Sequence, residues 1–311
     1  MQNSEMEQQE KRRKEIFARL NRDFKLPSPS ATVLEVMRLC NSESSSLKEI
    51  ADLIQTDPAL SAEIINYANS AFLATGVQVA SVQKATVKLG MKTVVNLALG
   101  FSLLSSNRIG KCAQFDYPLF WGTSLAEALA ARELCSRYGN FDPDEIFITA
   151  LLAHMGTLSM ATLFPEEYAT MLKDQAGNFP AKSREVEVFG IDRAEFTVEL
   201  FLNWGMPAQY ALAAGFHEDL GRVELGTGKV LQAATLLFLA HHIAALCQST
   251  ECQPETLKTI LQTAEKYAVP ITPFSELFDT IVTSWHEHGR LFDITTQDCY
   301  SYNEDDISRL E

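Results

Sequence analysis

The stretch SLKEIADLIQTDPALSAEIINYANSAF, residues 46–72, decides the fold of this protein. Its apolar residues recur at helical spacing in two sets, which are Leu47, Ile50, Ala51 and Ile54, and then Leu60, Ile64, Tyr67 and Ala68. Ser46 and Glu49 have the spacing of a capping box. Asp57-Pro58 combines a carboxylate that can cap free backbone N–H groups with a proline suited to the first helical position. We therefore predict two helices joined by a short turn.

Helical periodicity continues along most of the chain. Thr32 and Glu35 form a second possible capping box, and Gly90 separates two further helical stretches. Further helices are predicted at about 8–22, 118–138, 143–164, 193–204, 207–217 and 229–248, with two more between 255 and 290. VQVASV at 77–82 alternates weakly but is short, so we expect a loop. The predicted fold class is all-α, with residues 292–311 as an acidic, loosely held tail.

Composition disfavours nucleic acid as a partner. The 311 residues are 46% hydrophobic, enough for one large domain or two small ones, and carry a net charge of −14. The basic run at 11–14 is flanked by acids and is predicted to be a solvated helix face. The two helices within 46–70 could form a helix-turn-helix, but the second offers Glu63 and no Arg or Lys to reach bases. A helical hairpin within a bundle is therefore preferred.

The sequence favours a reduced, cytoplasmic setting without a membrane. Its six cysteines show no CxxC spacing, and residues 1–15 lack the apolar segment of a signal peptide. No uninterrupted apolar run reaches spanning length, and the best candidate, 230–246, contains His241 and His242. We therefore expect a cytoplasmic protein.

Several motifs occur in a fixed order along residues 24–247. They are LPSPS at 26–30, DPAL at 57–60, ANSA at 68–71, LG at 89–90, FW at 120–121, ALLAHMGTL at 150–158, GIDRAEF at 190–196 and NWGMP at 203–207. On these motifs the chain resembles the HDOD family, the HD-related output domain of bacterial signalling proteins. The motif residues singled out are Asp57, Pro58, Asn69, Ser70, Gly90, Trp121, Trp204 and Pro207.

The resemblance implies an N-terminal helical bundle packed on a degenerate form of the HD metal-phosphohydrolase bundle. We divide the chain into a charged helix at 1–25, an N-terminal HDOD subdomain at 26–112, a degenerate HD-like subdomain at 113–250, and C-terminal helices with the acidic tail at 251–311. Asn69 is predicted to end a helix, because asparagine tolerates left-handed backbone geometry. Trp204 to Pro207 is predicted to end one helix and begin the next.

The resemblance also implies where metal ligands would stand in a hydrolytic relative. Comparison with that pattern places Thr123 and Ala153 at two histidine positions, His154 at an aspartate position and Arg193 at a third histidine position. His217-Glu218 stands at a paired-histidine position and His241 at the last aspartate. Only His217 matches in both place and chemistry, and a cation at Arg193 would oppose a divalent ion. Because a competent site needs at least three protein ligands, we expect no catalytic residue, cofactor or metal.

These observations favour a non-catalytic signalling or regulatory protein that acts as an interaction scaffold for bacterial protein partners. Two alternatives stay open. One is a variant metal-dependent phosphohydrolase using His154, His217 and His241, since three histidines can bind zinc. The other is a sensor of a nucleotide or another anion, bound through Arg193 in the old pocket. The simplest interpretation is that the three histidines only fill a semi-polar cavity, hydrogen-bonded to backbone or water.

Overall fold

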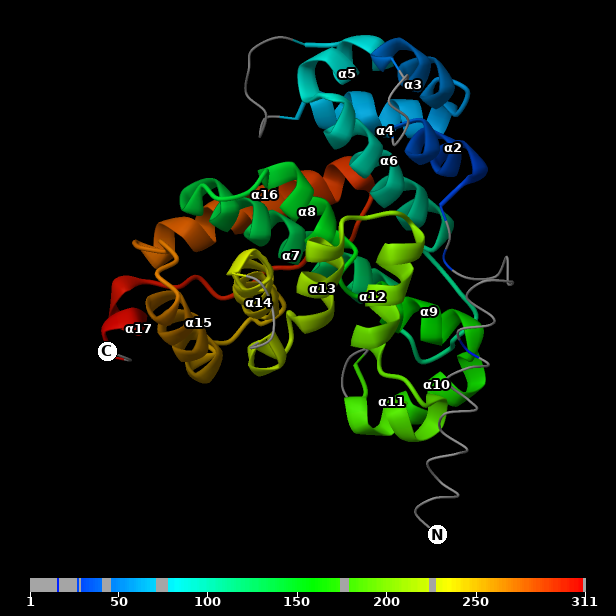
Figure 1. The fold of residues 1–311 in the computed structure, drawn as a ribbon. Helices are drawn as coiled ribbons and strands as arrows, with labels where there is room; N and C mark the ends of the chain where they lie inside the picture. Colours follow the sequence, from blue (N-terminus) through cyan, green and yellow to red (C-terminus); the bar gives the residue numbers. More distant parts are fainter. Residues whose placement is uncertain are drawn as a thin grey trace.

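The computed structural model describes residues 16, 27, 29–40, 46–70, 78–173, 179–223 and 228–309. The predicted helix at 8–22 and its basic run lie outside the described residues, apart from Ile16. Within the described ranges the chain is helical and forms no strand, which confirms the all-α fold class (Figure 1).

The described residues of the N-terminal part between 31 and 106 form five helices, drawn in blue to teal in Figure 1. They are α2 (Ala31–Cys40), α3 (Leu47–Ile54), α4 (Pro58–Ala68), α5 (Val82–Leu89) and α6 (Met91–Ser106). The predicted caps of the opening stretch are present. Ser46 and Glu49 form the capping box of α3. The Asp57 carboxylate accepts from the backbone N–H groups of Ala59 and Leu60, with Pro58 as the first residue of α4.

Two cap predictions in this part are wrong in detail. Helix α2 begins before Thr32, and its cap is the Ser30 hydroxyl, which accepts from the backbone N–H of Val33. Asn69 does end α4, but its φ of −99° is right-handed. Its amide instead bonds the backbone of Val79 in both directions, at 2.7 and 2.8 Å. Those two bonds tie the end of α4 to Val79, ten residues further along the chain.

The part predicted as the HD-like subdomain contains, among its described residues, nine helical elements. They are α7 (Tyr117–Tyr138), α8 (Pro143–Leu151), α9 (Met155–Leu163), α10 (Pro165–Leu172), α11 (Lys182–Phe189), α12 (Arg193–Asn203), α13 (Ala208–Phe216), the 3₁₀ turn η2 (Leu220–Val223) and α14 (Gly228–Cys247). Helix α7 lies at the centre, packed against α8, α14 and the later helix α16. It is apolar around most of its circumference, as expected of a helix covered on all sides.

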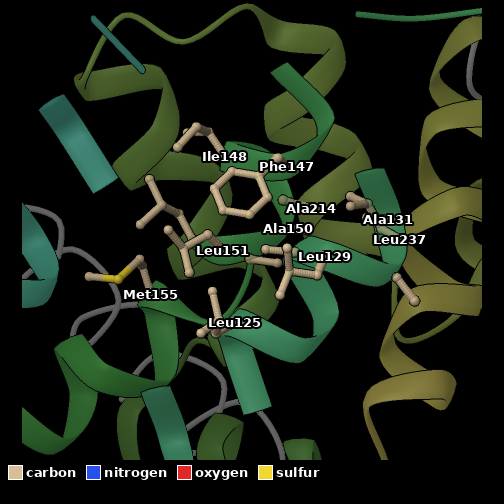
Figure 2. Close-up of a cluster of buried hydrophobic side chains, with 14 of the residues drawn as sticks. Leu125, Leu129, Ala131, Phe147, Ile148, Ala150, Leu151, Met155, Ala214 and Leu237 are labelled. Atoms are coloured by element: carbon tan, nitrogen blue, oxygen red, sulfur yellow. The ribbon is translucent and has the colours of Figure 1, made fainter. Parts of the chain in front are cut away.

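Buried hydrophobic side chains form the core between α7, α8 and α14. Figure 2 shows part of this cluster, with Leu125 and Leu129 of α7, Phe147 and Ile148 of α8, and Leu237 of α14 among its side chains. All five side chains are almost fully buried. This packing fixes the relative positions of the helices that carry the polar cluster described below.

The predicted helix at 143–164 is wrong, because the chain turns at 152–154 between α8 and α9. The apolar run hides the break, since residues 152–154 contain no glycine or proline. Trp204 and Pro207 behave as predicted, ending α12 and opening α13 around Gly205 with its φ of +74°. Gly90 likewise separates α5 from α6, with a φ of +86°.

The C-terminal part contains α15 (Pro254–Lys266), α16 (Phe274–Phe292) and α17 (Glu304–Ser308). The expectation of a loosely held tail is wrong for the described residues up to 309. Tyr302 is buried, and its hydroxyl accepts from the backbone N–H of Gln253. The Thr295 carbonyl lies so close to Gly122 of α7 that an added Cβ would meet it at 2.7 Å. The tail is therefore held against α7 at Thr295 and against the start of α15 at Tyr302.

Two helical stretches are long and apolar enough to cross a membrane by length and composition alone, and a bent pair of helices could count as a third. They are Pro143–Leu163 and Gly228–Cys247. In the first, 89% of the most apolar 18-residue segment is buried inside the fold, and in the second the buried share is 67%. The expectation that no stretch reaches spanning length is thus too strict. Their burial accounts for the apolar composition, since these helices form the protein core.

Candidate functional site

Four polar side chains from four parts of the HD-like bundle converge in its interior. Glu127 comes from α7, His154 from the turn before α9, His217 from the residue that ends α13, and His241 from α14. One donor atom from each lies within 4.8 Å of the corresponding atom of every other. We call these four residues the Glu127 cluster.

The Glu127 carboxylate lies between the three imidazoles. Its Oε2 is 2.8 Å from Nε2 of His154 and 3.4 Å from Nδ1 of His241, while its Oε1 is 3.5 Å from Nε2 of His217. The side chains of Glu127, His154 and His217 are at most 3% exposed, whereas His241 is 27% exposed. The cluster is thus closed to solvent except along His241.

The electrostatics of the cluster follow from burial opposed by close partners. Burial raises the pKa of Glu127, but His154 and the other histidines outweigh it and hold that pKa well below its usual range. Burial lowers the pKa of His217 to about 4, against a weaker opposing pull from Glu127. Burial also lowers the pKa of His241, but its hydrogen bond to Glu127 and the negative charges of Glu127 and Glu218 together outweigh burial and leave that pKa raised. At neutral pH, Glu127 is therefore ionised and His217 neutral.

The hydrogen-bond partners fix where the His217 proton lies. Its Nδ1 contacts the backbone carbonyl of Ala214, which can only accept, so Nδ1 carries the proton. Nε2 then presents a lone pair toward Oε1 of Glu127. Both of these buried atoms lack a hydrogen-bond partner among the described residues, as does Nδ1 of His154. Two acceptors thus face each other in the interior, which costs free energy unless something positive lies between them.

A second layer of charge surrounds the cluster. Nε and Nη2 of Arg193 donate to the two oxygens of Glu218 at 2.9 and 2.8 Å. Its Nη1 donates to Glu185 and to the backbone carbonyl of Pro180. Lys182 adds a contact of 3.0 Å to Glu218. Glu218 is therefore held away from the cluster centre, with Oε1 3.8 Å from Nδ1 of His154.

This second layer also shifts pKa values. Burial raises the pKa of Glu218, but its hydrogen bonds to Arg193 and the charges of Arg193 and the nearby histidines together outweigh burial and hold that pKa far below its usual range. Burial lowers the pKa of Arg193, and the two carboxylates more than reverse the effect. Arg193 and Glu218 consequently stay charged as a pair across the physiological range.

The structure places the sequence-predicted positions in two groups. His154, His217 and His241 come together, with Glu218 and Arg193 beside them. Thr123 lies on α7, four residues before Glu127. Ala153 offers only its backbone carbonyl, which accepts from the Thr197 hydroxyl at 3.2 Å.

The family motif residues act elsewhere, mainly in caps and helix packing. One example is Trp121, whose Nε1 donates to the backbone carbonyl of Asn107 at 3.0 Å.

Sequence reasoning missed Glu127, which is the centre of the cluster. A signal existed, because Glu127 stands in SLAEALAA, where small and apolar residues surround a single carboxylate. A charged side chain on an otherwise apolar helix is seldom fully buried without partners. One helical turn separates it from Thr123, at a predicted ligand position, so both positions share one side of α7.

The chain belongs to the HDOD family, whose HDOD domain model matches residues 26–220. Among solved structures it is similar to the MmoQ response regulator from Methylococcus capsulatus str. Bath. The two share 32% sequence identity with a TM-score of 0.50, over 82% of this chain and 98% of that one. No curated protein matches the chain.

Two more distant structures share the fold. An HDOD domain protein of unknown function from Geobacter sulfurreducens has 19% identity and a TM-score of 0.70, covering 92% of this chain and 98% of that one. A protein from Shewanella amazonensis SB2B, named only provisionally as a metal-dependent phosphohydrolase, has 18% identity and a TM-score of 0.66 over 91% of this chain and 99% of that one. At these identities the likeness concerns the fold alone.

Proposed function

We propose that this protein is a non-catalytic signalling component of a bacterial cytoplasm, whose HDOD domain holds protein partners together rather than hydrolysing a phosphoester. The observation that carries this proposal is the Arg193–Glu218 pair. A hydrolytic metal site needs three protein ligands and one open position for water or substrate. Here a guanidinium stands at one histidine position of the hydrolytic pattern, and it takes both oxygens of the carboxylate at another.

The burial of the site supports the same proposal. A phosphoester substrate must reach the metal and its activated water, yet three of the four cluster side chains are nearly inaccessible. The ring of Phe179 also packs against the cluster. Its centroid lies 4.8 Å from that of the His154 ring and 5.5 Å from the Arg193 guanidinium. The similarity to a response regulator adds support for a role in signalling.

An anion sensor built on Arg193 has weaker support. Its guanidinium already makes four hydrogen bonds, to Glu218, Glu185 and the backbone of Pro180. A nucleotide phosphate would have to displace carboxylates that neutralise the same charge. The second candidate function is therefore a variant phosphohydrolase, which the convergence of three histidines and Glu127 favours.

A hydrolysis assay separates the two candidates. Purified full-length protein is loaded in turn with Mn²⁺, Fe²⁺ and Zn²⁺ and incubated with cyclic dinucleotides, (p)ppGpp and bis-p-nitrophenyl phosphate. We expect no turnover above that of Glu127→Gln and His217→Ala variants. Metal-dependent turnover that both substitutions abolish would overturn the non-catalytic proposal.

The scaffold role is tested by capturing protein partners from the native host. Immobilised full-length protein is expected to enrich specific proteins, and an excess of the free chain should compete them away. Mass spectrometry identifies the competed set. If no protein is competed under crosslinking conditions, the scaffold proposal fails.

A further inference from the structure

We infer that Glu127, His154, His217 and His241 bind one divalent transition-metal ion of the zinc class, as a closed structural centre that ties four parts of the HD-like bundle together. The inference goes beyond the proposed signalling function and does not depend on it. It rests on three observations about this chain, which concern the donor set, the unpartnered lone pairs and the surrounding charge.

The donor set suits such an ion. Three imidazoles and one carboxylate match the ligands that zinc takes in proteins, and imidazole is a preferred ligand of the later first-row metals. Tetrahedral zinc with bonds of about 2.0–2.1 Å places its donors about 3.3 Å apart. The four donors here already lie within 4.8 Å of one another. Side-chain adjustments of about 1 Å would complete the coordination, without rearrangement of the helices.

The lone pairs point to a cation rather than to a further hydrogen bond. Nε2 of His217 and Oε1 of Glu127 face each other at 3.5 Å, and neither has a hydrogen-bond partner among the described residues. Nδ1 of His217 donates to the Ala214 carbonyl, which is the outer contact that commonly orients a metal-binding histidine. A cation between the two acceptors satisfies both at once.

The charged residues around the cluster are compatible with a bound cation at its centre. Glu218 lies 3.8 Å from Nδ1 of His154, where it can orient that ring from outside, while Arg193 and Lys182 hold its carboxylate in place. Arg193 itself is neutralised by Glu218 and Glu185 and so does not repel an ion at the centre. Four protein ligands leave no open position, which is the mark of structural rather than catalytic zinc sites.

His241 provides the entry path and the best test position. It is the one cluster side chain with appreciable exposure, and its neighbour His242 provides a matched control on the same helix. Nδ1 of His242 bonds the Phe238 carbonyl within α14, and His242 is not one of the clustered residues. Replacement of either histidine removes one imidazole from a partly exposed position.

The test measures metal content and affinity. Full-length protein is purified without a metal-affinity resin and analysed by elemental mass spectrometry. It is then stripped with chelator and titrated with Zn²⁺ against a chromophoric competitor. We expect about one bound ion per chain, a higher melting temperature with Zn²⁺, and the visible absorption bands of tetrahedral Co²⁺ on cobalt substitution.

The variants make the assignment specific. His241→Ala and Glu127→Gln should weaken Zn²⁺ binding by more than about 100-fold, since even outer partners of a metal ligand cost 10- to 100-fold. His242→Ala should bind like the wild type. Circular dichroism of the stripped proteins shows whether each variant is folded, and His241→Ala serves if Glu127→Gln does not fold.

Two results would overturn the inference. One is a folded wild type that holds no ion and shows no Zn²⁺-dependent rise in melting temperature. The other is equal Zn²⁺ affinity in His241→Ala and His242→Ala. Neither result affects the signalling proposal, which fails only through phosphoester turnover or the lack of a competed partner.

Discussion

Replacing Gly156 by alanine tests how tightly the turn at His154 is packed against α12. A Cβ added to Gly156 would lie 2.1 Å from the backbone oxygen of Arg193 and 2.8 Å from Oγ1 of Thr197. Real Cβ atoms do not approach neighbours below 3.0 Å, so α9 and α12 would have to separate by about 1 Å. The nearest atom is backbone and cannot rotate away.

The expected cost combines two effects. Forcing a methyl group into this packed contact costs about 1–3 kcal/mol. The separation also stretches the hydrogen bond from the Gly156 backbone N–H to Oγ1 of Thr197, now 3.0 Å long and buried, which is worth about 0.5–1.5 kcal/mol. Alanine returns at most about 1 kcal/mol through its better helix propensity. We therefore expect Gly156→Ala to lower the free energy of unfolding by about 0.5–4.5 kcal/mol.

Urea denaturation followed by circular dichroism measures this loss. Gly228→Ala is the matched control, because Gly228 begins α14 and an added Cβ there meets nothing within 4 Å. The control should change the free energy of unfolding by less than about 1 kcal/mol and in the stabilising direction. If Gly156→Ala unfolds at the same urea concentration as Gly228→Ala with an unchanged slope, the close contact between α9 and α12 is refuted.

Three further predictions concern other parts of the bundle. Nη2 of Arg132 lies 3.0 Å from the Asp144 carboxylate, which is 18% exposed. Arg132→Met leaves that carboxylate without its buried cation and should lower the free energy of unfolding in urea by about 3–5 kcal/mol. A loss below about 1 kcal/mol would contradict this expectation. Burial raises the pKa of Glu63 to about 7, above its ordinary 4.5, so the wild type should lose stability as pH rises between these values. Glu63→Gln lacks that loss, and its advantage should grow by no more than about 1 kcal/mol over this window, because the side chain is only half-buried. Trp285→Phe removes the 2.8 Å hydrogen bond from the indole Nε1 to the Gly122 carbonyl. The free energy of unfolding should fall by about 1–3 kcal/mol, within a single cooperative transition. A separate early transition would show instead that α16 folds independently.

The local signals predicted the N-terminal helices well because their information lies within a few residues. The Asp57 cap and the Ser46–Glu49 box are contacts over two or three positions. The same reasoning failed at Thr32, where two acceptable caps lie two residues apart and the structure uses Ser30. It also failed for Asn69, whose amide bonds the backbone of Val79 ten residues away.

The break at 152–154 and the packed tail were hidden for a different reason. In 143–164 the apolar pattern is continuous, because both α8 and α9 are buried in the same core, so hydrophobic periodicity cannot separate one helix from two. In the tail, polar composition suggested weak attachment. Tyr302 and the backbone near Thr295 are nevertheless held by contacts with Gln253 and Gly122.

By itself, the sequence determined the all-α class, the helical caps of the opening stretch and membership in the HDOD family. It also indicated that the hydrolytic ligand pattern is altered at Thr123, Ala153 and Arg193. Tertiary structure alone decided that His154, His217 and His241 surround Glu127, since these residues come from segments up to 114 positions apart. The physical reason is that a ligand pattern compares positions one by one, whereas a binding site depends on distance, burial and charge balance among side chains that only the packed helices bring together.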